Sequence, residues 1–224
     1  MSKSTHIVSI DGPAGAGKSS TARAVAKKLG FAFLDTGAMY RAATWRVMNA
    51  GLDWKDTDAL VDSTRAMDLE IRETPAGQVV RVDGTDVTEA IRTPEVTRNI
   101  YRLDQIPAVR RQLVELQRRF GDAQPTVAEG RDIGTVVFPQ AACKVYMDAS
   151  IEERAKRRAL EMEAKGMVVD LEALQQEIAQ RDEASMTRAD SPLRPAEDSV
   201  HLDTTGKSFE SVVDEVVALA KARL

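Results

Sequence analysis

Along most of the chain, short apolar runs take turns with stretches in which apolar residues recur at helical spacing. Short apolar runs predict strands at residues 7–10, 31–34, 126–128, 144–148 and 199–202. Between these runs, apolar residues recur at helical spacing, as in Ala22, Val25, Ala26 and Leu29, where Gly30 ends the pattern. Strands that alternate with helices form a mostly parallel sheet with helices on both faces. The pattern therefore predicts an α/β fold with a five-stranded parallel sheet.

Two stretches depart from this pattern. Residues 69–72 and 79–82 alternate with a period of two around turn residues, which predicts an antiparallel hairpin with a third short strand near Val87. We therefore expect residues 62–104 to be a small lobe inserted into a single domain of residues 1–224. Residues 155–188 predict two charged helices interrupted by Gly166. This pair is either a mobile lid that excludes water or a static solvated hairpin.

Composition narrows the class of protein. Hydrophobic residues make up 43% of the chain and charged residues 29%, which is ordinary for a globular enzyme, and the net charge of −4 does not indicate a nucleic-acid-binding surface. The apolar runs are too short to span a membrane, and the polar N-terminus does not resemble a signal peptide. Cys143 is the only cysteine, so an internal disulfide framework is excluded. We expect a cytoplasmic monomer without nucleic-acid or membrane partners.

The first predicted strand runs into the sequence GPAGAGKS at residues 12–19, a complete match to G-x-x-x-x-G-K-S/T. In this motif, the P-loop, backbone N–H groups converge on nucleotide phosphates, Lys18 reaches the β and γ phosphates, and the Ser19 hydroxyl ligates Mg²⁺. The predicted ATP-binding residues are Gly12, Pro13, Ala14, Gly15, Ala16, Gly17, Lys18, Ser19, Ser20 and Arg157.

Polar residues follow two further predicted strands, at residues 35–41 and 129–134. The carboxyl ends of parallel strands meet at one edge of the sheet, where ligands bind. Glu129 can hold the water shell of Mg²⁺ as a Walker B acid does, although a glycine turn with a salt bridge would have the same sequence. Asp35 or Thr36 can contact a ligand or simply cap the next helix, and Arg41 can bind a ligand or be solvated.

A P-loop core with an inserted lobe and a lid is typical of a small-molecule kinase, which must enclose two phosphate-bearing substrates. A GTP-dependent switch would need the guanine-reading sequence N-K-x-D, which does not occur. A pure nucleotide-binding module would have no use for Arg41 and Arg131. His6 and His201 are too few for a histidine metal site or a Ser-His-Asp triad.

Four segments together resemble bacterial cytidylate kinases, and the resemblance extends over essentially the whole chain. They are residues 10–19, residues 35–41, residues 130–139, and Arg181-Asp182 with Arg188 and Pro192-Leu193. The resemblance implies transfer of the γ-phosphoryl group of ATP to CMP or dCMP, with Mg²⁺ required. The alternatives are another nucleoside monophosphate kinase, acting on UMP or dTMP, and a P-loop ATPase that serves as a binding module.

The resemblance also implies roles for individual residues. Arg41, Arg131 and Arg188 would hold the acceptor phosphate, and Arg110 with Asp132 would read the cytosine edge. Lys18, Arg131 and Arg188 would be the catalytic cations, and Ser19 and Glu129 the metal site. The expected CMP-binding residues are Thr36, Tyr40, Arg41, Tyr101, Arg110, Arg131, Asp132, Arg181, Ser185 and Arg188.

The chain departs from the family pattern at several positions. Thr36 and Glu129 are conservative replacements of a serine and an aspartate, whereas Tyr101 stands where a serine often helps to hold the base. Ser185 replaces an aspartate that would bind the sugar hydroxyls. We therefore hypothesise that discrimination between CMP and dCMP is weakened.

Overall fold

The computed structural model describes residues 4–74, 77–164 and 166–224. Contacts divide the chain into two compact units. The first consists of the chain up to Leu34 together with Gln124–Leu224, and the second is Asp35–Ala123. Among the described residues, no helix has the length and apolar character needed to cross a membrane.

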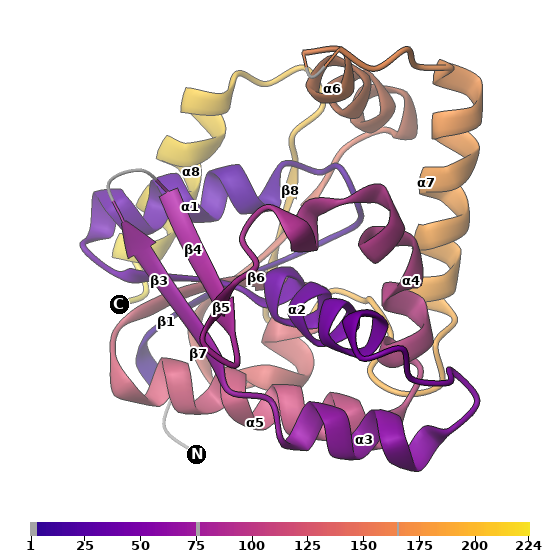
Figure 1. Ribbon diagram of the computed structural model, residues 1–224. Helices are drawn as coiled ribbons and strands as arrows, with labels where there is room; N and C mark the ends of the chain where they lie inside the picture. Colours follow the sequence, from indigo (N-terminus) through magenta and orange to yellow (C-terminus); the bar gives the residue numbers. More distant parts are fainter. Residues whose placement is uncertain (1–3, 75–76, 165) are drawn as a thin grey trace. The chain divides into compact units, whose positions relative to one another are not determined.

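The first unit is built on a five-stranded sheet with the order β2-β6-β1-β7-β8 (Figure 1). The strands are β1 (Ser4–Asp11), β2 (Ala32–Asp35), β6 (Thr126–Gly130), β7 (Ala141–Asp148) and β8 (Val200–Asp203). The pairs β1–β6, β1–β7 and β7–β8 are parallel. The predicted five-stranded α/β core is confirmed. Because Asp11 lies opposite both Gly130 and Tyr146, the P-loop begins beside the carboxyl ends of β6 and β7.

The described residues of this unit form four α-helices: α1 (Lys18–Leu29), α6 (Ile151–Glu163), α7 (Leu171–Met186) and α8 (Phe209–Lys221). Helices α1 and α8 share one hydrophobic core with the strands, to which Val25 and Val216 contribute fully buried side chains. The predicted end of the first helix is confirmed, since Gly30 ends α1 in a left-handed conformation. At the start of α6, the Ser150 hydroxyl caps the helix by accepting from the Glu153 N–H.

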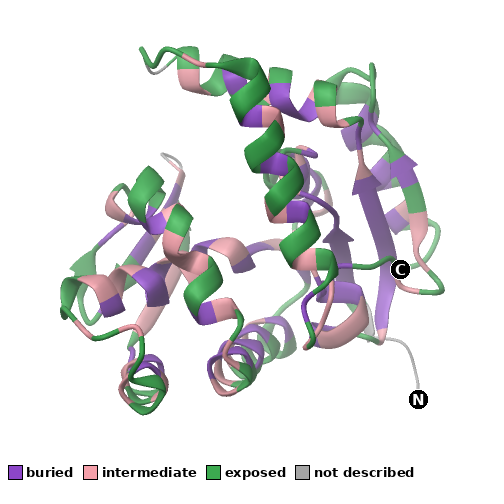
Figure 2. Cartoon of the chain, turned by 90° about the vertical axis from the view of Figure 1, so that its right-hand side faces the viewer, coloured by how far each residue is buried: buried purple, intermediate pink, exposed green. Residues whose placement is uncertain are grey.

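Helices α6 and α7 pack against each other through a small core of Ala155, Ala159, Leu174 and Ile178. Asp170 caps α7 by accepting from the N–H groups of Glu172 and Ala173. Figure 2 shows α7 as a mostly exposed helix with separate buried positions. Its buried residues Leu174, Ile178 and Asp182 recur at every fourth position, so the charged Asp182 lies on the same buried face as the two apolar side chains.

The second unit, as far as the structure describes it, combines four α-helices with a small sheet. The helices are α2 (Thr36–Asn49), α3 (Thr57–Arg65), α4 (Pro94–Asp104) and α5 (Pro107–Ala123), with a 3₁₀ turn η1 (Ala90–Arg92) before α4. The strands β3 (Leu69–Thr74), β4 (Gly77–Val82) and β5 (Thr85–Asp86) are antiparallel, in that order (Figure 1). The predicted hairpin and third strand are confirmed. Asp83 and Gly84, with φ of 50° and 78°, form the second turn. Residues 75 and 76 of the predicted first turn lie outside the described residues.

Helices α3 and α4 are absent from the sequence-based prediction. Acidic and polar residues dominate the start of α3, but the Asp56 carboxylate caps it by accepting from the Ala59 N–H at 3.0 Å. Thr93 caps α4 and Pro94 occupies its first turn, a sequence signal that was available. Both helices bury leucines, Leu60 and Leu103, in the core of this unit.

Candidate active site

The P-loop of the first unit requires glycine at particular positions. A Cβ at position 12 would lie 1.9 Å from the Met147 carbonyl oxygen, and Gly12 has φ of 150°. Gly15 and Gly17 also have positive φ, and Gly17 is the N-cap of α1, which no side chain of the described residues caps. The N-terminal N–H groups of α1 are therefore available to an anion, and the helix dipole favours one there.

Lys18, the second residue of the motif's G-K-S ending, is 8% exposed and donates from Nζ to the Pro13 carbonyl oxygen at 2.8 Å. Burial lowers the pKa of Lys18 to about 8, and the nearby Arg131 guanidinium acts in the same direction. A buried cation under this electrostatic stress gains strongly from a negative ligand, which fits a lysine that binds phosphate.

Ser19 and Glu129, the two residues that the sequence assigns to Mg²⁺, are hydrogen-bonded to each other. The Ser19 hydroxyl at the start of α1 donates to Glu129 Oε1 at the end of β6, at 2.6 Å. Hydroxyl and carboxylate oxygens are the hard donors that Mg²⁺ takes, together with waters and substrate phosphates. The described residues contain no cluster of three or more His, Cys, Asp or Glu side chains suited to a metal. Mg²⁺ does not need such a cage when phosphates supply ligands, so the residues present fit this ion.

The loop after β6 is fixed by Asp11, a residue outside the predicted site set. Its carboxylate accepts from the N–H groups of Ile133 and Gly134, each at 2.7 Å, where the π-helix η2 (Ile133–Val137) begins. Burial raises the pKa of Asp11 to about 7, more than these two hydrogen bonds lower it. Asp11 immediately precedes the motif in sequence, but only the pairing of β1 with β6 reveals its partners.

The fixed loop delivers Arg131 and Asp132. Arg131 Nη1 donates to the Gly12 carbonyl oxygen at 3.3 Å, so this side chain reaches the P-loop. Burial and the nearby Arg181 lower the pKa of the Arg131 guanidinium. Arg188, just beyond α7, lies 4.0 Å from the Asp132 carboxylate and donates from Nε to the Asp190 carbonyl oxygen at 2.7 Å. The structure therefore brings these predicted residues of the first unit together.

Two other predicted residues of this unit make contacts within the protein. Arg157 donates from Nε to Glu153 at 2.9 Å and from Nη2 to the Thr204 carbonyl oxygen at 2.8 Å, and its Nη1 lies 3.8 Å from the position of a Cβ at Gly17. Arg157 thus lies beside the P-loop. The Ser185 hydroxyl donates to the Arg181 carbonyl oxygen of the preceding helical turn at 2.8 Å.

In the second unit, Asp35 and Arg41 pair at the start of α2. Asp35 caps the helix by accepting from the Ala38 N–H at 2.8 Å, which is the structural alternative left open by the sequence. Its other carboxylate oxygen accepts from Arg41 Nη2 at 3.0 Å. The Arg41 side chain is 21% exposed, and its buried Nε has no hydrogen-bond partner among the described residues. Arg41 is therefore fixed by one ion pair and still has an N–H group that can donate to a ligand.

The remaining predicted residues of this unit differ in burial. Arg110 on α5 is 3% exposed, with its guanidinium carbon 5.7 Å from the centre of the Tyr40 ring, a cation–π arrangement. Thr36 is also buried. Tyr101 is 55% exposed, and Arg102 lies 5.9 Å from its ring centre. The structure thus pairs Tyr40 with Arg110 and leaves Tyr101 at the surface of its unit.

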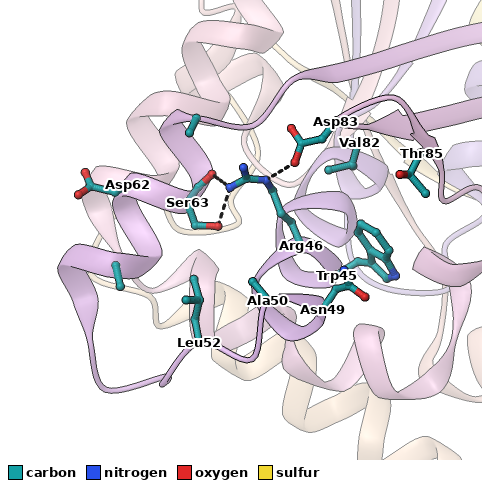
Figure 3. A pocket seen from close by; sticks show the side chains of 12 residues that line it. Trp45, Arg46, Asn49, Ala50, Leu52, Asp62, Ser63, Val82, Asp83 and Thr85 are labelled. Atoms are coloured by element: carbon teal, nitrogen blue, oxygen red, sulfur yellow. Dashed lines mark hydrogen bonds and ion pairs between the residues drawn. The ribbon is translucent and has the colours of Figure 1, made fainter.

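A separate hollow of about 560 Å³ lies in the second unit between α2, α3 and the β4–β5 turn (Figure 3). Arg46 crosses it, donating from Nε to Asp83 at 2.7 Å and from Nη1 to the Ser63 hydroxyl at 2.8 Å. None of the predicted site residues lines this hollow. Because its arginine is bonded to the protein's own oxygens, it lacks the uncommitted charge that a phosphate site needs.

The fold and the sequence can be compared with known proteins. A solved structure of an uncharacterised protein from Eubacterium ventriosum has a TM-score of 0.53 at 11% identity, covering 98% of this chain and all of that one. A gluconokinase from Sinorhizobium meliloti has a TM-score of 0.50 at 15% identity, covering 98% of this chain and 94% of that one. These likenesses show the fold alone.

Sequence comparison goes further. The bifunctional pantoate ligase/cytidylate kinase of Synechococcus elongatus is 47% identical over 97% of this chain, which spans 42% of that protein's length. The cytidylate kinase of Geobacillus kaustophilus is 43% identical over 97% of both chains, and that of Rhodococcus opacus is 46% identical over 100% of this chain and 98% of its own length. The cytidylate kinase family model matches residues 8–222. The chain therefore belongs to the cytidylate kinase family.

Proposed function

We propose that this protein transfers the γ-phosphoryl group of ATP to CMP or dCMP, forming CDP or dCDP and ADP. The observation that carries the proposal is the group of cations at the P-loop of the first unit, where Lys18 and Arg131 both contact loop carbonyls, in a chain of this family. Lys18 and Arg131, with Arg188, offset the charge that develops on the transferring phosphoryl group. The acceptor is already a phosphate oxygen, so no general base is required.

Mg²⁺ is the proposed cofactor, held by Ser19 and, directly or through water, by Glu129. The 2.6 Å contact between these side chains supports this assignment, because the two oxygens lie close enough together to serve the same ion. The ion supplies charge neutralisation on the β and γ phosphates when ATP is bound. The ATP-binding loop comprises residues 12–20. Arg157 lies beside it at Gly17 and is fixed there by its hydrogen bonds to Glu153 and Thr204.

For the acceptor, we propose phosphate contacts from Arg41 of the second unit and from Arg131 and Arg188 of the first. Asp132 and Arg110 are proposed to read cytosine, whose exocyclic amine needs an acceptor and whose N3 and O2 need a donor. Uracil would set its O4 against the Asp132 carboxylate. A site built on such polar pairs rejects the wrong base because buried groups would be left unpaired.

The remaining proposed acceptor contacts are Thr36, Tyr40, Tyr101, Arg181 and Ser185. Position 185 carries a hydroxyl and no carboxylate, and that hydroxyl already donates to the Arg181 carbonyl oxygen rather than facing a ribose. This contact supports weakened discrimination between CMP and dCMP. Ser185→Asp should raise the ratio of kcat/KM for CMP over dCMP, and equal ratios in both proteins would contradict the idea.

Residues 62–104 are proposed as the acceptor-binding lobe and residues 155–188 as a lid. The first range lies within the second unit, and the second carries most of α6 and all of α7. We further propose that the protein acts as a monomer, which size-exclusion chromatography with light scattering would test. The cytoplasmic location expected from the sequence stays a prediction.

The decisive experiment is a coupled ADP-release assay in which CMP, dCMP, UMP, AMP, GMP and dTMP are offered separately. Strong stimulation by CMP and dCMP is the expected result. A preference for UMP or dTMP would replace the proposal with another monophosphate kinase. ATP hydrolysis without stimulation by any acceptor would indicate a binding module instead.

A further inference from the structure

The first half of the P-loop is held by an unusual series of contacts. Three successive carbonyl oxygens, at residues 12–14, each accept a hydrogen bond from a different cation: Arg131 at 3.3 Å, Lys18 at 2.8 Å and Arg154 at 3.0 Å. Lys18 and Arg131 belong to the predicted site. Arg154, on α6, does not, although it is 7% exposed and bonded to the loop.

Arg154 is committed on several sides. Its Nε donates to the Ala149 carbonyl oxygen at 2.9 Å, just before α6, and its Nη1 also bonds the Asp182 carboxylate. Gly15 leaves room for this approach, since a Cβ there would lie 3.1 Å from the Arg154 Cβ. A guanidinium this buried and this fully bonded acts on the protein rather than on a ligand.

Asp182 completes the arrangement from α7. Its Oδ1 accepts from the Ala14 N–H at 3.1 Å, and the same oxygen lies 3.6 Å from Arg131 Nη1. Asp182 is 6% exposed. Both backbone polar groups of Ala14 are thus bonded to the pair formed by Arg154 and Asp182, one to each side chain.

We propose that Arg154 and Asp182 are positioning residues that clamp the P-loop to α6 and α7 and thereby set its phosphate-binding conformation. Fixing the Ala14 peptide orients the loop that leads to the N–H groups at the start of α1. The carboxylate also steadies Arg131 near Gly12. The helix that supplies this carboxylate carries Arg181 and Ser185, so the clamp ties proposed acceptor residues to the ATP-binding loop. Only the link to the acceptor residues rests on the proposed function; the clamp on the P-loop does not.

The test compares Asp182→Ala, Asp182→Asn, Arg154→Met and the double variant Arg154→Met/Asp182→Ala in the full-length protein. Calorimetric affinity for ATP and steady-state kcat and KM are measured well below each melting temperature. Asp182→Ala should weaken ATP affinity and lower kcat, each by about 10- to 100-fold, because a misplaced loop loses near-attack geometry. Asp182→Asn keeps an acceptor for the Ala14 N–H and should recover part of the loss.

If the two side chains act through each other, the double variant should lose about as much as the worse single variant rather than the product of both losses. Arg158→Met is the matched control, since Arg158 lies on the same helix and pairs with Glu161 at 3.0 Å on an exposed face. It should change ATP affinity less than about twofold.

A lowered melting temperature with unchanged ATP affinity and kcat would overturn the proposal, because the pair would then be merely structural. Loss of ATP affinity in Arg154→Met but not in Asp182→Ala would also overturn it, since Arg154 would then act on ATP directly. If Asp182→Ala does not fold, Asp182→Asn answers the same question. The ATP affinity needs no acceptor, so failure of the wild type to phosphorylate CMP would refute the proposed function without touching the clamp.

Discussion

The cations at the P-loop and the arginine at the start of α2 use their N–H groups differently. In the first unit, Lys18, Arg131 and Arg154 each bond a carbonyl oxygen of the loop. In the second unit, Arg41 bonds one carboxylate, that of Asp35, and its buried Nε has no partner among the described residues. The P-loop cations therefore donate to the protein's own backbone, whereas Arg41 keeps a buried N–H group without a partner among the described residues.

This difference separates two tasks of a phosphoryl-transfer site. A cradle that must present backbone N–H groups needs its carbonyls turned away and bonded, which interior cations accomplish. An acceptor phosphate needs positioned cations with N–H groups left over to donate, and Arg41 keeps such a group. Buried guanidinium groups in one protein can therefore differ in function, and their bonding partners distinguish them better than their burial does.

Replacing Arg41 should have the largest effect. Arg41→Met should lower kcat/KM for CMP by about 10²- to 10³-fold, as loss of one charged donor at a reacting group does, while ATP affinity stays unchanged. The unfolding free energy should fall by about 1–3 kcal/mol, because the buried Asp35 carboxylate loses one of its hydrogen-bond partners. Steady-state kinetics and urea unfolding measure the two. Unchanged CMP kinetics would erase the distinction drawn here.

Asp132 offers the next largest effect, on base selectivity. Asp132→Asn keeps one acceptor for the cytosine amine but adds an N–H that can donate to the O4 of uracil. The ratio of kcat/KM for CMP over UMP should fall by at least about tenfold, while ATP affinity is retained. Asp132→Ala should instead damage CMP kinetics more than ATP binding. Unaltered CMP kinetics in both variants would refute the role of Asp132 in reading the base.

The sequence predicts the features that depend on local pattern, namely the P-loop motif and the ends of the strands. Because parallel strands deliver their carboxyl ends to one edge, Glu129 is expected on the same side of the sheet as the P-loop. The direct hydrogen bond from Ser19 to Glu129 is seen only in the structure. The partners of Asp11 and Asp182 do not follow, because no local pattern shows which N–H groups these carboxylates bond. Helix periodicity places Asp182 on the buried face of α7, but the strand register and the packing of α7 decide which groups the two carboxylates meet.

The sequence contains signals for α3 and α4 that the prediction does not use. Asp56 and Thr93 are typical N-cap residues, but the acidic composition before α3 and the hairpin pattern next to α4 favour irregular structure there. The π-helix at Ile133–Val137 has no such signal. It is tied down from outside by the Asp11 carboxylate, a tertiary contact.

Asp11→Asn should have an intermediate effect that depends on pH. An amide can accept from only one of the two N–H groups, so the unfolding free energy should fall by about 1–3 kcal/mol. Burial raises the pKa of Asp11 from 3.8 to about 7 in the folded protein. Between about pH 4 and pH 7 the native state therefore keeps a proton on Asp11 that the unfolded state has lost. The stability that comes from this raised pKa is fully present below about pH 4 and is lost as the pH rises to 7. The unfolding free energy of the wild type minus that of Asp11→Asn should therefore decrease over that range. An increase of this difference in urea unfolding from pH 4 to 8 would contradict the assignment.

Arg46 provides the smallest effect and the sharpest contrast with Arg41, because both lie on α2. Its guanidinium bonds Asp83 and Ser63 of the same unit, so it should behave as a structural arginine (Figure 3). Arg46→Met should lower the unfolding free energy by about 1 kcal/mol and leave kcat/KM for CMP within about twofold of wild type. The bond with Arg46 lowers the pKa of Asp83, so the loss should be complete above about pH 4 and should shrink as Asp83 becomes protonated below it. Urea unfolding at pH 3 and pH 7 checks the stability, and a large kinetic loss in this variant would mean that committed and uncommitted arginines on α2 serve the acceptor alike.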